Sequence, residues 1–277
     1  MNRILPVFIF LIICTSLNSQ TMRFLYNYQF KLDSLHREKQ ASETMALDVS
    51  PENGSAFYSY KKYQQDSISK SGGNSTYETV DRAKVKFFVT KKYPDYASVL
   101  YTSIGPTAVN MSSNKKLEWN ILPDKDSLQG YPVQKATLNF QGRRWTAWFT
   151  PEIQIQDGPY RFYGLPGLIL KVEDQKADHI FTLIGIKKMG TEKISTSNFI
   201  NRKSIEVNEQ QFSKLWKNYK KDPARDYRMK YSGPSSGGNL NVGGQIISKR
   251  EIIKKYEEQA LEKIKSENNF IELEMYK

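Results

Sequence analysis

The chain has 277 residues, with 41 lysines and arginines against 29 aspartates and glutamates, and a formal net charge of +12. Its basic pairs are spread along the chain and do not gather in one stripe, so we expect a solvated surface and no nucleic-acid partner. Two histidines and one cysteine do not supply the ligand spacings of a metal site, and no phosphate-loop or dinucleotide fingerprint is present. We therefore predict neither a metal nor another cofactor.

Residues 1–20 have the three-part layout of a secretory signal peptide, with Arg3, an apolar stretch from Ile4 to Cys14, and small or polar residues after it. This stretch is too short to span a bilayer, and no later segment is long enough. We therefore expect a periplasmic or secreted protein with no transmembrane span and with peripheral contact to the cell envelope. Residues 21–277 are predicted to form one β-rich domain, and they contain no thiol.

Short strands dominate the first two thirds of the chain. Aromatic and polar residues alternate from Met22 to Leu32, which predicts the first strand. Further strands are predicted at 44–49, 56–63, 84–90, 97–104, 117–121, 134–140, 143–150, 160–172 and 179–187. Short turns join these strands, and strands do not alternate with helices. The fold class is therefore α+β and mainly β, built on a strongly curved antiparallel sheet, an open half-barrel or bowl.

The turn at Leu165-Pro166-Gly167 introduces a strongly apolar strand. Pro166 presets φ for the second position of a type II turn, and Gly167 accepts the positive φ that the third position needs. Leu168 to Val172 then predicts a strand buried on most of both faces. This segment determines shape and carries no reactive side chain.

Helices are predicted after residue 191. Asn208 and Gln211 form a capping-box pattern that starts one helix, and Asp222-Pro223 ends it. Glycine pairs in 224–244 predict a long flexible loop. A C-terminal helix is predicted over 248–265, starting at Ser248, and its apolar stripe needs the sheet as a partner.

The stretch from Asn120 to Asp174 resembles the GLPGLI family of secreted bacterial proteins, whose name corresponds to residues 164–169. Motifs similar to the family pattern are Gly130-Tyr131, Gln134-Lys135-Ala136-Thr137, Gly142-Arg143, Ala147-Trp148-Phe149-Thr150, Glu152-Ile153, Asp157-Gly158-Pro159-Tyr160 and, upstream, Phe57-Tyr58-Ser59-Tyr60. Val133 departs from the pattern, because members often carry a cysteine there. The resemblance implies export and a β-rich fold, and it implies no established activity.

Seven residues of this block are candidate ligand contacts: Arg143, Trp145, Trp148, Tyr160, Tyr163, Leu165 and Pro166. Strand alternation places Arg143 and Trp145 on one face and Trp148 on the other. Aromatic rings beside guanidinium groups can stack on sugars or planar ligands. We favour the alternative that both rings serve packing, with Trp148 in the core and Trp145 covering a sheet edge.

No catalytic residue is assigned. Neither His36 nor His179 is accompanied by a Gly-x-Ser-x-Gly elbow, so a serine triad is not favoured. The remaining option is a pair of carboxylates facing each other across a cleft. The carboxylates that flank the aromatic block are Glu152, Asp157, Glu173 and Asp174. Structural roles in turns and at strand ends are favoured for them, so the sequence favours a protein that is not an enzyme.

The predicted function is an exported, non-catalytic cell-envelope protein that binds an apolar ligand, a lipid or an extended peptide in the bowl. Two alternatives stay open. One is a carbohydrate-directed enzyme or accessory module with a glycan ligand, and the other is a structural assembly partner.

Overall fold

A computed structural model describes residues 20–70, 83–190, 203–231, 239–242 and 245–277. The predicted signal peptide lies outside these residues, apart from Gln20. Within the described part of the chain, no helix is both long and apolar enough to cross a membrane.

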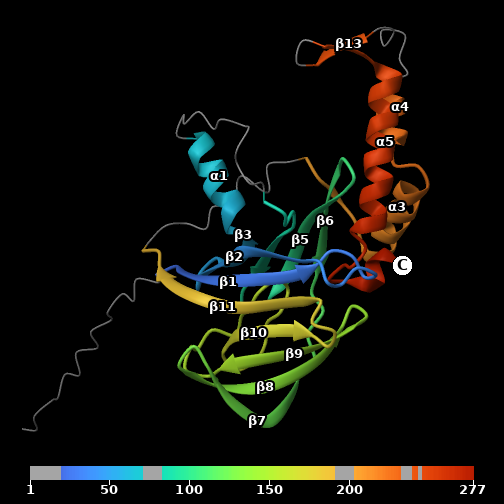
Figure 1. Ribbon diagram of the computed structural model, residues 1–277. Helices are drawn as coiled ribbons and strands as arrows, with labels where there is room; N and C mark the ends of the chain where they lie inside the picture. Colours follow the sequence, from blue (N-terminus) through green and yellow to red (C-terminus); the bar gives the residue numbers. More distant parts are fainter. Residues whose placement is uncertain (1–19, 71–82, 191–202, 232–238, 243–244) are drawn as a thin grey trace, which may run out of the picture.

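Two strand meanders build one twelve-stranded sheet (Figure 1). The first consists of β1 (Met22–Lys31), β2 (Gln40–Ser50), β3 (Gly54–Ser59), β4 (Phe88–Lys92), β5 (Ala97–Ile104) and β6 (Thr107–Ser113). The second consists of β7 (Asn120–Leu128), β8 (Tyr131–Phe140), β9 (Arg143–Thr150), β10 (Leu168–Asp174) and β11 (His179–Lys188). The meanders join where β1 pairs antiparallel with β11. A short strand, β12 (Ile205–Glu206), adds parallel to β6 at one edge.

The connection between the meanders requires the sheet to curl. Strands β6 and β7 are ten strand spacings apart in the sheet order, which is about 48 Å in a flat sheet. The six residues that join them, 114–119, reach at most about 25 Å when extended. The sheet must therefore bend until these two strands approach each other. The predicted mainly β fold with a strongly curved sheet is confirmed (Figure 1).

The concave face carries the core. On β1 the alternation is as predicted, because Phe24, Tyr26, Tyr28 and Phe30 are all buried. Strand β10 is buried at five of its seven positions, which agrees with the predicted burial on most of both faces. Burial of apolar side chains on this scale is the main stabilising contribution to such a sheet.

The helices lie outside the sheet. They are α1 (Tyr60–Lys70), α3 (Glu209–Lys221), α4 (Arg225–Lys230), α5 (Lys249–Ser266) and the 3-10 turn η2 (Leu273–Tyr276). The predicted capping box is confirmed, since Asn208 accepts from Gln211 N and Gln211 accepts from Asn208 N. Ser248 caps α5 as predicted. Helix α5 rises beside the sheet, and only its C-terminal end approaches the concave face (Figure 1).

Two predicted segments differ from the observed ones. The strand predicted over 56–63 ends at Ser59, because the Ser59 hydroxyl accepts from Lys62 N and caps α1. Of the loop predicted over 224–244, residues 232–238 and 243–244 lie outside the described residues. The rest contains α4 and the first strand of a hairpin, β13 (Asn239–Val242) with β14 (Gln245–Ser248).

Several other strands differ from their sequence predictions. The strand predicted over 84–90 is observed as β4, at 88–92, and the one predicted over 160–172 is observed as β10, at 168–174. Strand β6 was not predicted, and β7 runs from Asn120 to Leu128 instead of 117–121. Pro123, Asp124 and Asp126 occur within β7. They are tolerated because β7 is an edge strand, where proline and charges block further pairing.

Candidate ligand-binding cavity

The loop 151–167 between β9 and β10 fills part of the bowl. Its Tyr160, Phe162 and Leu165 side chains are buried. The ring of Trp145, on β9, contacts the ring of Phe162, and the two centroids are 4.7 Å apart. The indole of Trp119, in the connection 114–119, donates to the Tyr163 carbonyl at 2.8 Å. The loop is therefore part of the core and is not a mobile rim.

A buried ion pair fixes this loop to the first meander. The side chains of Lys91, on β4, and Asp157 contact each other and are both 0% exposed. Ser55 and Tyr93 donate their hydroxyl protons to Asp157 Oδ2. Lys91 Nζ also donates to three loop carbonyls, those of Gly158 at 2.7 Å, Tyr160 at 3.0 Å and Phe162 at 3.4 Å. Buried charges need such pairing, so each partner depends on the other.

The Leu-Pro-Gly turn differs from the predicted type II turn. Gly167 N donates to Leu165 O at 2.7 Å, which is the bond of a tighter three-residue turn centred on Pro166. The prediction of a positive φ at Gly167 is confirmed, with φ at 144°. A Cβ at this position would lie 2.0 Å from the carbonyl oxygen of Thr150. Glycine is therefore required at this position for two reasons, the positive φ of the turn and the close packing against β9.

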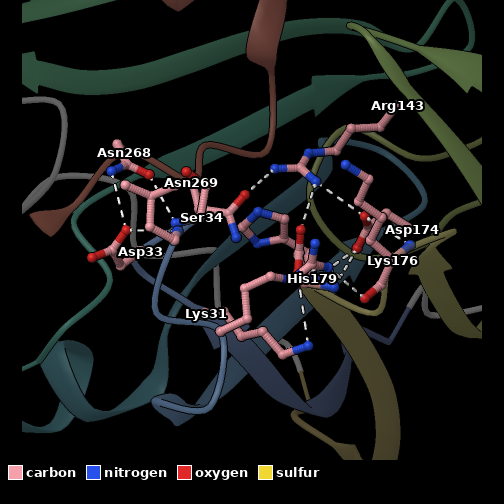
Figure 2. A network of polar contacts seen from close by, with 12 residues as sticks. Lys31, Asp33, Ser34, Arg143, Asp174, Lys176, His179, Asn268 and Asn269 are labelled. Atoms are coloured by element: carbon pink, nitrogen blue, oxygen red, sulfur yellow. Dashed lines mark hydrogen bonds and ion pairs between the residues drawn. The ribbon is translucent and has the colours of Figure 1, made fainter.

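Arg143, at the start of β9, anchors the C-terminal segment, which we define as residues 267–277. Its guanidinium donates to Asn269 Oδ1 and to the Phe270 carbonyl, both at 2.6 Å. The same group pairs with Asp174 at 3.0 Å, and Asp174 also accepts from the backbone of His179 (Figure 2). The C-terminal segment is therefore held against the sheet by buried, charge-assisted hydrogen bonds.

A second set of contacts closes the same segment over the bowl. Glu272 is 2% exposed and accepts from Tyr160 and from Arg161, at 2.7 and 3.0 Å. The rings of Phe270 and Tyr276 stack, with centroids 3.6 Å apart, and both meet Trp216 of α3 edge-on. These contacts form a wall opposite the sheet.

A cavity of about 280 Å³ lies between this wall and the concave face. This volume is near the lower end of small-molecule sites, at about 300 Å³. Its apolar and aromatic lining consists of Tyr28, Phe30, Leu32, Val85, Phe87, Leu100, Tyr160, Trp216, Tyr219, Ala260, Ile264, Phe270, Ile271, Met275 and Tyr276. Its polar lining includes Thr102, His179 and three lysines, Lys84, Lys86 and Lys263. Apolar walls with a few polar groups are typical of ligand sites.

His179 lines the inner part of the cavity as a neutral ring. Its Nδ1 lies 2.7 Å from the Tyr28 hydroxyl, while its buried Nε2 has no hydrogen-bond partner among the residues that the structure describes. Burial lowers the pKa of His179 to about 3, and the neighbouring Arg143 acts in the same direction. The side chain therefore contributes no charge to the cavity at neutral pH.

The lysines mark the mouth of the cavity, since all three are exposed. Val85 and Phe87 alternate with Lys84 and Lys86 and are less exposed. Lys263, on α5, pairs with Glu267 at 3.2 Å. Contact with Lys263 lowers the pKa of Lys86, with burial as the second cause. Two ammonium groups therefore face each other at the opening.

Of the seven candidate contacts, only Tyr160 lines the cavity. Trp145 and Leu165 are 0% exposed within the core, Arg143 and Tyr163 are buried in hydrogen bonds, and Pro166 is exposed on its turn.

The expected packing of the two tryptophans is the reverse of the observed one. Trp145 lies in the core and donates to Phe140 O at 3.2 Å. Trp148 is half-buried on the other face, with Lys135 above its ring. Alternation places the two rings on opposite faces but does not say which face is concave.

Apart from Tyr160, the candidate contacts predicted from the sequence do not form the cavity. Tyr28 and Phe30 lie within the predicted first strand, Lys86 lies within the strand predicted over 84–90, and Lys263 lies within the predicted C-terminal helix. A local signal is present in 84–87, where lysines alternate with apolar residues. The pairing of that segment with α5 depends on tertiary structure and has no sequence signal.

The carboxylates considered for catalysis have structural partners. Asp157 and Asp174 are buried in ion pairs, and Glu173 pairs with Lys171 at 2.8 Å. Glu152 is exposed. Among the described residues, no group of three or more His, Cys, Asp or Glu side chains could hold a metal ion.

Comparison with known families gives one match. Residues 90–171 match the model of a family described as "Protein of unknown function (Porph_ging)". The matched part holds β5 to β9 and the loop 151–167, and it is less than half of the chain. This match is compatible with an uncharacterised bacterial family, and the narrower resemblance to the GLPGLI family stays a prediction. The comparison with curated proteins gave no match.

Solved structures show a likeness of fold. Two structures of PNGF-II, in the P21 and C2 space groups, each give a TM-score of 0.51 over 71% of this chain, at 14% and 15% identity. They are covered over 33% and 32% of their own length, so the chain spans about a third of these proteins. A LolA superfamily protein, NE2245 from Nitrosomonas europaea, gives a TM-score of 0.26 at 9% identity, over 66% of this chain and 90% of that one. The last likeness is too weak to support an argument.

Proposed function

We propose that this protein is a binding protein that holds a small apolar molecule in the cavity between the concave sheet and the C-terminal segment. The observation that carries the proposal is the cavity itself, about 280 Å³ with a mostly apolar and aromatic lining. The predicted signal peptide at 1–20 extends the proposal to a site outside the cytoplasm, in the cell envelope.

A small molecule or a single acyl chain suits this site better than an extended peptide. Peptides that add to a sheet need an open strand edge with unpaired backbone groups. The strands that line the cavity are β1, β5 and β11, and each of them has neighbours on both sides. The ligand must therefore be held by side chains, which favours an apolar body.

The glycan alternative has lost its main support. It relied on Trp145 as a stacking platform, and this ring is 0% exposed. Trp148 is more accessible, but Lys135 covers its ring. We do not propose carbohydrate binding.

The test is binding of a neutral apolar fluorophore, N-phenyl-1-naphthylamine, to the purified protein. Thr102 shares a face of β5 with the buried Leu100 and lines the cavity, so Thr102→Trp fills it. We expect the affinity to fall by about tenfold or more, because the ring competes for the same space. Ser112→Trp, on exposed β6 sequence outside the cavity, is the matched control and keeps the wild-type affinity. Equal binding by both variants contradicts the proposal.

A further inference from the structure

We propose that the ligand of this cavity is an anionic amphiphile, with its apolar body inside and a carboxylate held at the mouth by Lys86 and Lys263. This inference rests on the proposed function and adds the charge of the ligand to it. The observations that carry it concern the arrangement of charge around an otherwise apolar space.

The mouth has an excess of positive charge. Its charged groups are the exposed Lys84, Lys86 and Lys263 and the half-buried Glu267. Three positive charges and one negative charge leave an excess of two. The other acidic residue of the lining, Glu272, lies deep and is neutralised by Arg161 at 3.0 Å. Low-dielectric walls concentrate such a field at the opening.

The lysines come from two segments that meet only in the folded protein. Lys86 precedes β4, and Lys263 lies in the last turns of α5. Their ammonium groups contact each other, and this contact lowers the pKa of Lys86. Two like charges in contact repel each other, and Glu267 offsets only one of them. An anion between them relieves the repulsion, whereas a cation increases it.

Apolar groups lie directly behind the charged mouth. Ile264 and Ala260 stand on the same helix as Lys263, and Phe87 follows Lys86 in sequence. A molecule with its anionic group at the lysines would therefore place its apolar part among Leu100, Trp216 and the C-terminal segment. Fatty acids have this chemistry, with one carboxylate and one flexible apolar chain.

The experiment measures displacement of bound N-phenyl-1-naphthylamine by three twelve-carbon competitors: dodecanoate, dodecan-1-ol and dodecyltrimethylammonium. We expect dodecanoate to compete about tenfold better than the alcohol, because its carboxylate can pair with the partly exposed Lys86 and Lys263. The cation should compete worst. The preference should decrease as salt is raised. Equal competition by dodecanoate and dodecanol overturns the inference but leaves the proposed function intact, whereas failure of the fluorophore to bind overturns both.

Variants of the mouth test the assignment of residues. The double variant Lys86→Met with Lys263→Met keeps the apolar stems of both side chains. In this variant dodecanoate should compete about as well as dodecan-1-ol, and competition by dodecan-1-ol should equal that in the wild type. Lys92→Met with Lys125→Met removes two exposed lysines outside the cavity and is the matched control. Glu267→Gln removes the anion that competes for Lys263, so dodecanoate should bind more tightly. Weaker binding in this last variant, or an unchanged preference in the first, contradicts the inference.

Discussion

The contact between Lys91 and Asp157 shows how single residues hold the interior of this sheet together. Both side chains are 0% exposed, and together they tie the loop 151–167 to β3 and β4. Removing one partner leaves the other charge buried without its opposite charge. The pair therefore stabilises the fold only as a unit.

Lys91→Met should lower the free energy of unfolding by about 3–5 kcal/mol, measured by chemical denaturation. Lys92→Met, the exposed neighbour on the same strand, is the control and should change it by less than about 0.5 kcal/mol. The double variant Lys91→Met with Asp157→Asn should lose less than the sum of the two single variants. Additive losses would show that the ion pair does not couple the two residues.

His179 gives a prediction for pH dependence. Its pKa in the folded protein is lowered to about 3, against 6.5 for the free side chain. Below pH 6.5 the unfolded chain binds a proton that the folded protein does not. Stability should therefore be full above pH 6.5 and decrease toward pH 3, by at most about 1.4 kcal/mol per pH unit.

Unfolding measured between pH 5 and 6.5 checks this prediction. His179→Gln should show a flatter dependence of stability on pH than the wild type. The matched control is His36→Gln, which replaces an exposed histidine. A slope that falls equally in both variants would contradict the assignment to His179.

At the scale of elements, the C-terminal segment forms one wall of the cavity and depends on Arg143. This guanidinium bonds to Asn269 and Phe270, and the carbonyl of Leu32 accepts from the backbone of Asn268 and Asn269. Asn268 Nδ2 adds a bond to Asp33 (Figure 2). The segment is thus attached by polar contacts on one side and by aromatic packing on the other.

Arg143→Met should increase amide hydrogen exchange in residues 268–276, because it removes the donors that hold this segment. Hydrogen-exchange mass spectrometry measures the change. Arg144→Met, on the opposite and exposed face of β9, is the matched control and should leave the exchange of this segment unchanged. If exchange in the segment does not increase in Arg143→Met, the aromatic contacts alone hold it.

Local rules predicted the elements whose determinants are local. The caps at Asn208 and Ser248, the alternation in β1 and the apolar run of β10 follow from neighbouring residues and were correct. The reversal of Trp145 and Trp148 and the missed strand β6 depend on which face and which edge the whole sheet buries. The site was missed for the same reason, since its walls are far apart in sequence.

At the scale of the whole molecule, the short connection 114–119 and the filled bowl define the architecture. The connection forces two strands near opposite edges to approach each other, and the loop 151–167 occupies part of the space enclosed. The remaining space lies beside β1 and β5 and is closed by α3, the end of α5 and the C-terminal segment. The predicted bowl is confirmed as a curved sheet. The loop 151–167 and the C-terminal segment occupy part of its interior and leave the cavity between them and β1 and β5.

The most direct test of this account is a crystal structure of the protein with N-phenyl-1-naphthylamine bound. We predict one fluorophore between Thr102 of β5 and Ile264 of α5, beneath the lysines of the mouth. A fluorophore bound on the outer face of the sheet, with the cavity filled by its own side chains, would contradict the central claim.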